Sequence, residues 1–165
     1  MTTHKVAERT GLPLGVKIRT YRREDLRGML WVFHEAVHRS CAGAYSPEQL
    51  AAWAPETVDE EAWARRFAGS QTRVAVSAHG EVVGFANLEG AGYLDCLYVA
   101  PEAQGRGVGS ALCAALETLA SGDIEVRASL VARPFFEGRG YRVLREVHPV
   151  RAGLALPAFD MRLAR

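Results

Sequence analysis

The stretch LDCLYVAPEAQGRGVGSALCAALETL, residues 94–119, decides the fold of this chain, because it joins a strand, a tight turn and a helix. Leu94, Leu97 and Val99 are apolar residues that favour strands. Pro101 has no amide hydrogen to donate, so the strand ends before it. After the turn, apolar residues recur at helical spacing, which predicts an amphipathic helix packed on a core.

Three glycines, Gly105, Gly107 and Gly109, lie at the junction between this strand and this helix. Glycine has no Cβ, so a ligand can approach the backbone closely there. The first amides of a helix have no partner inside the helix, and the helix dipole adds positive potential at the same end. The pattern therefore predicts a phosphate site built from main-chain amides.

Other phosphate-binding motifs fit this turn less well. A Walker A loop needs Gly-Lys followed by Ser or Thr, and the sequence has no such triplet. A Rossmann fingerprint needs a third glycine where Ser110 stands, and it follows an early strand, whereas this turn lies late in the chain. Glycines that serve only tight helix packing remain an open interpretation.

Composition indicates an ordinary globular protein without a global charge. The chain has 165 residues, a length typical of one domain, with 48% hydrophobic and 24% charged residues. Lys and Arg number 20 against 19 Asp and Glu, so no net field favours nucleic acid or a membrane as partner. No long apolar run or secretion signal is evident, so we expect a cytoplasmic protein.

The three cysteines, Cys41, Cys96 and Cys113, are odd in number and widely spaced. This usage favours reduced thiols over a disulfide framework. Cys96 and Cys113 raise the alternative of a covalent acetyl-cysteine route, but both are expected to be core thiols.

Periodicity predicts the remaining elements in chain order. We expect a flexible leader over 1–15, a strand over 16–21, helices over 23–39, 46–54 and 59–68, strands over 72–78, 81–89 and 93–99, a strand over 123–130, a helix over 133–138, and strands over 141–150 and 159–163. This order predicts an α+β (α/β) fold, with a mixed, mostly antiparallel sheet of six to seven strands and helices on both faces. A single domain would span residues 16–165.

Several motifs resemble one enzyme family. The pattern Gln104-x-x-Gly107-x-Gly109, after a strand that ends in Val-x-Pro, resembles the pyrophosphate loop of the GCN5-related N-acetyltransferases (GNAT), which bind acetyl-coenzyme A. Further motifs are similar to the YafP-like branch of bacterial acetyltransferases, namely Tyr45-Ser46-Pro47-Glu48-Gln49, Leu97-Tyr98-Val99 and Pro134-Phe135-Phe136-Glu137.

The resemblance implies an N-acetyltransferase with acetyl-CoA as co-substrate and a primary amine of a small molecule or peptide as acceptor. It also implies that the central strands splay and that the pantetheine arm binds between them, on the backbone of Leu97 and Val99. The implied cofactor-binding residues are Leu97, Tyr98, Val99, Gln104, Gly105, Arg106, Gly107, Val108, Gly109, Ser110, Phe135 and Phe136.

An amine is mostly protonated at neutral pH and must lose a proton before it attacks a thioester. Strand alternation places Tyr93, Asp95 and Leu97 on one face and Cys96 and Tyr98 on the other. We therefore expect Asp95 to be the catalytic base, directly or through water. The alternative is a structural acid that holds an arginine or a loop amide.

The departing thiolate has no obvious proton donor. In many relatives a tyrosine on the last short helix protonates it, but the matching residue here is Phe136, which has no proton to give. Tyr45 or Tyr93 could take this role, or solvent could, because a thiol has a pKa near 8.5. Because Phe136 departs from the family pattern, a non-catalytic acyl-CoA-binding module remains an alternative function.

A competing motif, His34-Glu35-Ala36-Val37-His38, matches H-E-x-x-H on a predicted helix. Two histidines four residues apart share a helix face and could hold zinc. The metzincin extension is absent, because Cys41 and Ala44 stand where Gly and His would be needed. A zinc hydrolase is therefore the less favoured alternative, and we expect no metal.

The acceptor side gives the weakest signal. The helices that carry His34, His38, Tyr45 and Trp53 flank the acceptor side in the resembling family, so these residues are candidates to line the amine pocket. A role in the core between helices and sheet is the alternative. The sequence leaves open which amine is acetylated and whether the protein is a monomer or a homodimer.

Overall fold

The computed structural model describes residues 12, 13 and 15–165. The leader expected over 1–15 lies almost wholly outside the described residues. The elements are β1 (Lys17–Thr20), η1 (Arg23–Asp25), α1 (Leu26–Glu35), η2 (Ala36–Ser40), α2 (Pro47–Trp53), α3 (Glu60–Ala68), β2 (Gln71–Val76), β3 (Val82–Glu89), β4 (Tyr93–Val99), η3 (Pro101–Ala103), α4 (Val108–Glu117), β5 (Ile124–Ser129), α5 (Arg133–Gly138), β6 (Arg142–Val147), β7 (Val150–Arg151), β8 (Leu154–Ala155) and β9 (Ala158–Leu163).

The predicted order of helices and strands from residue 16 onward is confirmed, with two differences. The helix expected over 23–39 begins with a 3-10 turn, η1, and ends with a π-helical turn, η2. The strand expected over 141–150 is too long: it divides into β6 and β7, and β7 forms a small hairpin with β8 that the sequence pattern did not predict. Ala152 and Gly153, at φ 48° and 79°, make its turn.

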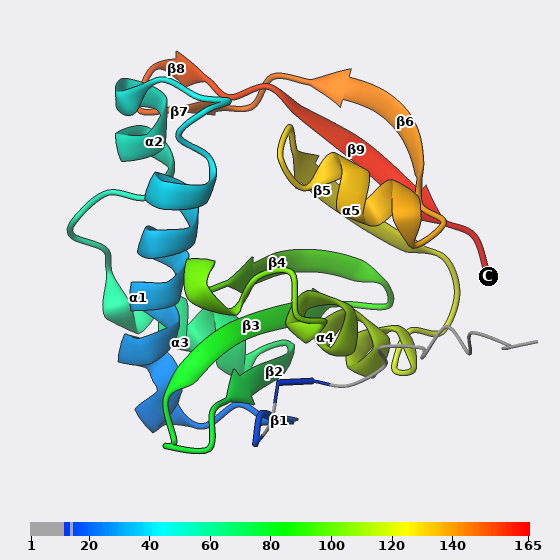
Figure 1. Ribbon diagram of the computed structural model, residues 1–165. Helices are drawn as coiled ribbons and strands as arrows, with labels where there is room; N and C mark the ends of the chain where they lie inside the picture. The colour runs from blue at the N-terminus through cyan, green and yellow to red at the C-terminus, as the bar shows by residue number, and fades with distance from the viewer. Residues whose placement is uncertain (1–11, 14) are drawn as a thin grey trace, which may run out of the picture.

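Seven strands form the main sheet in the order β1-β2-β3-β4-β5-β9-β6. Strands β1 to β4 are an antiparallel meander, whereas β4 and β5 run parallel. Only two residue pairs join β4 to β5, Tyr93 with Glu125 and Leu94 with Val126. Beyond them the two strands diverge, as Figure 1 shows. The expected splay of the central strands is therefore confirmed.

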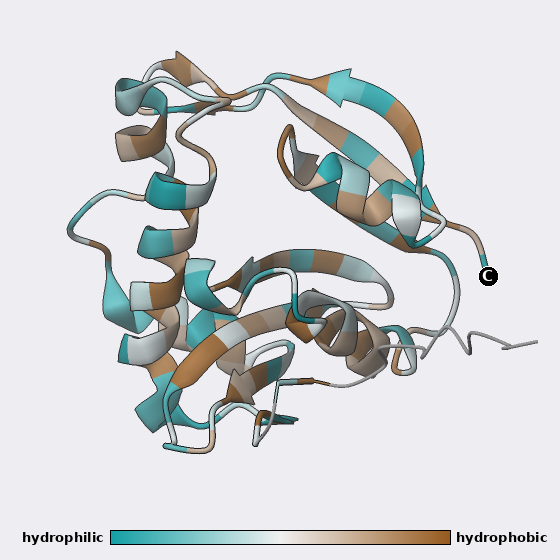
Figure 2. Cartoon of the chain, viewed as in Figure 1, coloured by the Kyte–Doolittle hydropathy of each residue, from teal (hydrophilic) through white to brown (hydrophobic). Residues whose placement is uncertain are grey.

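Helices cover both faces of the sheet, as predicted (Figure 1). Helices α1, α2 and α3 pack on one face around Phe33, Phe67 and Phe85, and α4 and α5 pack on the other around Leu112 and Met161. Figure 2 shows hydrophilic and hydrophobic residues mixed along α1. Its buried residues, Leu26, Met29, Val32 and Phe33, recur at helical spacing, the pattern of a helix that buries one stripe. These two cores hold β4 and β5 in place on either side of the splay.

A β-bulge interrupts β4 at the residue predicted to be the base. Asn87 of β3 pairs with Cys96, and Leu88 pairs with Leu94, so Asp95 is an extra residue between the two pairs. The side-chain alternation therefore changes phase at Asp95. A sequence pattern of period two cannot show where such an extra residue falls.

The bulge corrects the predicted faces of β4. Leu94 and Leu97 both contact the core under α4, whereas Cys96 belongs to the core under α1. Tyr93 and Asp95 line a cavity together with Cys96, on the face opposite Leu97. The expectation that Tyr93, Asp95 and Leu97 share one face is wrong, because the bulge turns the strand between them.

Candidate active site

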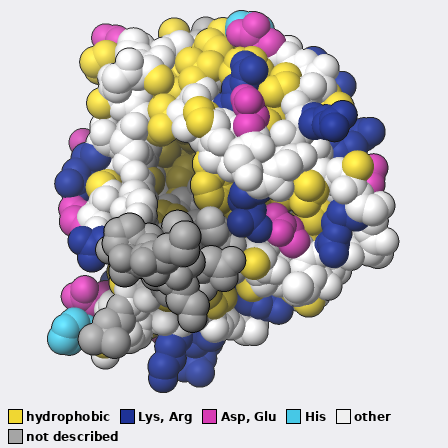
Figure 3. All heavy atoms as spheres, turned by 45° about the vertical axis from the view of Figure 1, so that its right-hand side comes forward, with side chains coloured by type: hydrophobic (Ala, Val, Ile, Leu, Met, Phe, Trp, Pro, Cys, Tyr) yellow, Lys and Arg dark blue, Asp and Glu magenta, His cyan; other side chains and the backbone are white. Residues whose placement is uncertain are grey.

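A cavity of about 390 Å³ opens where β4 and β5 diverge. Figure 3 shows a hollow on this face of the molecule with hydrophobic side chains along its floor. The predicted cofactor residues that line it are Leu97, Tyr98, Val99, Gln104, Gly105, Gly107, Gly109, Ser110, Phe135 and Phe136. The structure thus brings a strand, the glycine turn and α5 to one cleft, which we call the acyl cleft.

The glycine turn presents open amides at the start of α4. Gly105 and Gly107 have φ values of 71° and 85°, in the left-handed region that favours glycine. Gly107 is the N-cap of α4, and among the described residues no side chain accepts from the first-turn amides. Gly107, Gly109 and Ser110 line the acyl cleft, so the free donors of this helix start lie at its edge and suit an anion.

Tight packing does not explain the glycines at both ends of this turn. A Cβ atom added at Gly105 would meet nothing within 4 Å, and one added at Gly109 would lie 3.5 Å from the Phe135 ring, an ordinary contact. The left-handed backbone accounts for Gly105, and space for a ligand is the better reason for glycine at position 109.

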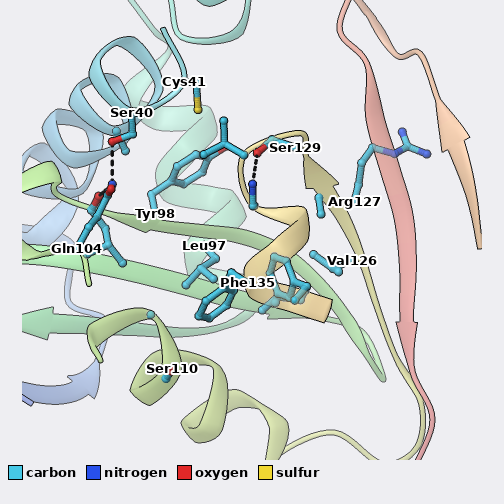
Figure 4. Close-up of a pocket in the computed structure, with 18 of the residues that line it drawn as sticks. Ser40, Cys41, Leu97, Tyr98, Gln104, Ser110, Val126, Arg127, Ser129 and Phe135 are labelled. Atoms are coloured by element: carbon cyan, nitrogen blue, oxygen red, sulfur yellow. Dashed lines mark hydrogen bonds between the residues drawn. The ribbon is translucent and has the colours of Figure 1, made fainter. Parts of the chain in front are cut away.

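Gln104 fixes the turn relative to its neighbours. Its Nε2 donates to the carbonyl oxygen of Val99 at 2.9 Å and to the Ser40 hydroxyl at 2.8 Å, as Figure 4 shows for Ser40. Ser40 also lines the acyl cleft, and the sequence analysis missed it. Its place follows from the π-helical turn η2, which no simple periodicity predicts.

Two predicted cofactor residues do not line the acyl cleft with their side chains. Val108 is buried in the core under α4, so only its backbone amide is available to a ligand there. Arg106 is exposed on the outside of the turn and is not part of the lining. Contact of its guanidinium with a phosphate remains a prediction.

Phe135 and Phe136 form an apolar wall of the acyl cleft. Their rings meet edge to face with centroids 5.1 Å apart, and Phe136 meets Tyr141 in the same way. Phe136 is only 2% exposed, so its ring belongs mainly to the core. A ligand would meet hydrocarbon here and no proton donor.

A second, smaller cavity of about 170 Å³ lies on the other side of β4 and adjoins the first. Both cavities share a set of lining residues, Trp53, Asp95, Tyr98, Arg127 and Ser129. The walls of the second cavity are largely aromatic and include Phe33, Tyr45, Trp63 and Tyr93. We call it the aromatic cavity.

Three side chains cross the wide end of the splay. Trp53 Nε1 donates to the Tyr98 hydroxyl at 3.1 Å, and the Trp53 ring meets the Tyr45 ring at 5.4 Å. The Tyr45 hydroxyl accepts from Leu130 N–H at 3.0 Å and donates to the Pro157 carbonyl at 2.6 Å. Tyr98 lies on β4 and Leu130 follows β5, so this aromatic bridge, Tyr45-Trp53-Tyr98, joins the two diverging strands.

Replacing Tyr45 by phenylalanine tests its part in the bridge. The variant leaves Leu130 N–H and the Pro157 carbonyl without partners, so we expect the free energy of unfolding to fall by about 2 kcal/mol in urea titrations. Turnover by the folded enzyme should stay within a few-fold. The control is Tyr93→Phe, whose hydroxyl makes no hydrogen bond within the described residues, and its stability should not change. Unchanged stability with lost turnover in Tyr45→Phe would instead make Tyr45 the proton donor.

Asp95 is held mainly by Arg66 and Asn87 at the junction of the two cavities. Its carboxylate accepts from Arg66 Nε at 2.6 Å, from an Arg66 terminal nitrogen at 2.5 Å and from Asn87 Nδ2 at 3.0 Å. Burial alone would raise the pKa of Asp95, but these hydrogen bonds lower it below the usual value. The carboxylate is therefore ionised at neutral pH.

Glu89 is the acidic neighbour of this pair. Its carboxylate lies 3.9 Å from Arg66 Nε and is partly exposed. Burial and the negative charge of Asp95 raise the pKa of Glu89. Two carboxyl groups that share one arginine therefore have pKa values pushed in opposite directions, an arrangement suited to passing a proton outward.

The two histidines of the H-E-x-x-H motif lie elsewhere. Their rings stack with centroids 4.2 Å apart, and His38 Nε2 is 2.7 Å from the Ala54 carbonyl oxygen. Neither His34 nor His38 lines the acyl cleft or the aromatic cavity. Their expected place in the amine pocket stays a prediction. Within the described residues, no group of three His, Cys, Asp or Glu side chains is placed to bind a metal.

All three cysteines are buried, and Cys96 and Cys113 lie in the core as expected. Burial raises the pKa of Cys41 to about 11 and that of Cys113 to about 12, and it raises the pKa of Cys96 as well. Only the thiolate is a good nucleophile, so an acetyl-cysteine route is disfavoured.

Comparison with known proteins gives a consistent picture. A family model described as the acetyltransferase (GNAT) domain matches residues 41–164. The uncharacterized N-acetyltransferase YafP of Escherichia coli is 36% identical over 148 residues, which cover 89% of this chain and 95% of that protein.

Solved structures show the same fold. A GCN5-related N-acetyltransferase from Rhodopseudomonas palustris has a TM-score of 0.86 at 35% identity and covers 90% of this chain and 95% of its own. The PaiA N-acetyltransferase of Thermoplasma acidophilum, solved in complex with coenzyme A, has a TM-score of 0.74 at 20% identity, with 91% and 99% of the two chains covered. In the part of the chain that the structure describes, no helix is long and apolar enough to span a bilayer.

Proposed function

The chain belongs to the GCN5-related N-acetyltransferase family, and we propose that it moves the acetyl group of acetyl-CoA directly onto a primary amine of a small molecule or peptide. One observation carries this proposal: the acyl cleft runs from an open glycine turn to a junction with a second cavity at Asp95. Such a cleft can hold a long acyl carrier at one side and an acceptor at the other. Residues 16–165 form the single domain in this proposal.

The glycine turn holds the pyrophosphate of acetyl-CoA through the amides of Gly107 to Ser110. The β4 ladder with β5 ends at Leu94, so the main chain of Leu97 and the N–H of Val99 remain available on that edge to the amide groups of pantetheine, while the Val99 carbonyl accepts from Gln104. Phe135 and Phe136 supply the apolar wall of the arm. The Leu97 N–H then polarises the thioester carbonyl as an oxyanion donor.

The aromatic cavity holds the acceptor, with Tyr45 and Trp53 in its wall. The bound ammonium first gives one proton to Asp95, directly or through water, and the free amine nitrogen then attacks the thioester carbon at the junction of the two cavities. The carbon–sulfur bond breaks to release the thiolate, and the nitrogen loses its second proton to solvent as the amide forms. Because its pKa is low, Asp95 keeps the first proton only briefly and passes it toward Glu89 and solvent.

The thiolate takes its proton from solvent in this mechanism. Tyr45 donates its hydroxyl hydrogen to Pro157, and Tyr93 lines the aromatic cavity but not the acyl cleft. Phe136 has no hydroxyl group and therefore cannot donate a proton. A thiol pKa of about 8.5 makes coenzyme A an adequate leaving group near neutral pH.

Two measurements test the proposal on the purified protein. Acetyl-CoA at 100 times its dissociation constant should stabilise the fold by about 2.7 kcal/mol and raise the melting temperature. Thiol release from acetyl-CoA should then depend on an added amine. A melting shift without turnover on any amine would favour the acyl-CoA-binding module. Stoichiometric zinc with no shift would contradict the transferase and favour a hydrolase.

A further inference from the structure

Three arginines line the aromatic cavity, and they come from distant parts of the chain. Arg66 lies on α3, Arg127 on β5 and Arg151 at the end of β7. The only carboxylate in the same lining is Asp95. The described lining of this cavity therefore carries more positive than negative charge.

Two of the three arginines are neutralised and fixed by the protein. Arg66 pairs with Asp95, and its guanidinium lies 4.7 Å from the centre of the Trp63 ring. Arg127 Nε pairs with Asp160 of β9 at 2.8 Å, and Figure 4 shows its side chain turned away from the cleft toward that strand. Neither guanidinium is free to bind a substrate anion.

Arg151 is different. Within residues 12, 13 and 15–165, it has no carboxylate partner at ion-pair distance, and its side chain is exposed at the mouth of the cavity. Burial raises the pKa of Tyr98, and the positive charge of Arg151 opposes that rise. Arg151 and Tyr98 line the same aromatic cavity, where the Tyr98 hydroxyl accepts from Trp53 in the aromatic bridge.

We infer that the acceptor is an aminocarboxylate with an apolar or aromatic body, whose carboxylate binds Arg151 while its amine reaches the junction at Asp95. This inference rests on the proposed transferase function and names the substrate class of the same site.

The chemistry of the cavity supports this class over other amines. An arginine fork matches a planar carboxylate through two parallel hydrogen bonds, which fixes orientation as well as charge. The walls of Phe33, Trp53 and Trp63 suit a flat or apolar body. Polycationic amines such as polyamines would place positive groups against Arg151 and are therefore disfavoured.

Matched pairs of acceptors isolate the carboxylate. Each pair has the same carbon body with and without the acid: L-phenylalanine against phenethylamine, and 4-(aminomethyl)benzoate against 4-methylbenzylamine. Spermidine is the polycationic comparison. The readout is kcat/KM from thiol release at saturating acetyl-CoA, across a range of pH that corrects for the fraction of free amine.

We expect the acid of at least one pair to be acetylated about tenfold more efficiently than its partner, and spermidine to be poorer than both. Arg151→Gln should lower kcat/KM about tenfold for that acid, mainly through KM, and leave kcat/KM for its partner without the acid within twofold. The matched control is Arg142→Gln, which removes an exposed arginine from β6 outside the cavity lining. Arg142→Gln should leave kcat/KM unchanged for both members of the pair.

Other outcomes overturn the inference. Equal use of both members of every pair, or equal loss for both in Arg151→Gln, would remove Arg151 as a carboxylate anchor. Turnover of spermidine, without turnover of the other four amines, would also remove Arg151 as a carboxylate anchor. If acetyl-CoA raises the melting temperature but none of these amines is acetylated, the substrate class is wrong while co-substrate binding stands. If acetyl-CoA does not bind, the proposed function itself fails.

Discussion

Replacing Gly107 by tryptophan is expected to reduce the affinity for coenzyme A at least 100-fold. Gly107 caps α4 at φ 85°, and it lines the acyl cleft together with Gly109 and Ser110. An indole at this position strains the backbone and fills the space over those amides, so a pyrophosphate cannot reach them. Isothermal titration calorimetry with coenzyme A measures the loss directly.

A matched glycine separates the lost site from general strain. Gly80, in the turn between β2 and β3, has φ 83°, is also exposed, and a Cβ atom there would meet nothing within 4 Å. Gly80→Trp should cost a similar amount of stability, about 1–2 kcal/mol, and keep full affinity. Acetyl-pantetheine lacks the diphosphate, so its weaker binding should respond far less to Gly107→Trp. Equal binding of coenzyme A by both tryptophan variants would rule out the glycine turn as its anchor.

Replacing Asp95 by asparagine is expected to lower kcat about 100-fold at pH 7, within the range typical of a lost general base. Asp95 is ionised in the free enzyme, because Arg66 and Asn87 lower its pKa despite burial. The normal enzyme can therefore bind the ammonium form and deprotonate it in the site. The asparagine variant must instead wait for free amine from solution.

The pH profile distinguishes this role from a structural one. For an amine with a pKa near 10, the fraction in the free, unprotonated form rises about tenfold with each unit of pH up to that value. The turnover rate of Asp95→Asn should therefore climb steeply from pH 7 to pH 9. The normal rate should change much less over that range. The loss in the variant should shrink accordingly at high pH.

Arg66→Lys is the partner control for the same question. Lysine keeps a positive charge but loses the bidentate contact of Arg66 with Asp95. The carboxylate of Asp95 remains in this variant. If Asp95 is the base, Arg66→Lys retains most of its turnover. If Asp95 only anchors Arg66, both variants should lose stability and turnover to the same extent, with unchanged pH profiles, and the proposed base would be wrong.

Sequence reasoning predicted the fold well because its signals are local and repeated. The alternation of residues 16–21 at β1, the β-rich segments of β2 and β3, the helical period of α1, and Ser46-Pro47 at the start of α2 each depend on a few neighbouring positions. The glycine turn was also identifiable, because Gly105 and Gly107 need backbone angles that other residues avoid. The splay was expected only through the family resemblance.

The acceptor side could not be predicted in the same way. The bulge at Asp95 changes the phase of β4 without leaving a mark in composition, and so the predicted faces were wrong. Arg66 and Arg151 reach one cavity from α3 and β7, and their meeting depends on the tertiary fold. His34 and His38 were expected near the acceptor, but the helix face that carries them lies outside both cavities.

The aromatic bridge has a consequence for the energetics of binding. The strands β4 and β5 are pinned by main-chain pairing at their narrow end and by Tyr45, Trp53 and Tyr98 at their wide end. Because the two strands are joined at both ends, the angle between them cannot change unless one of these contacts breaks. The space between β4 and β5 that takes the acyl carrier is therefore fixed before the carrier binds. Little conformational entropy is lost on association for this reason.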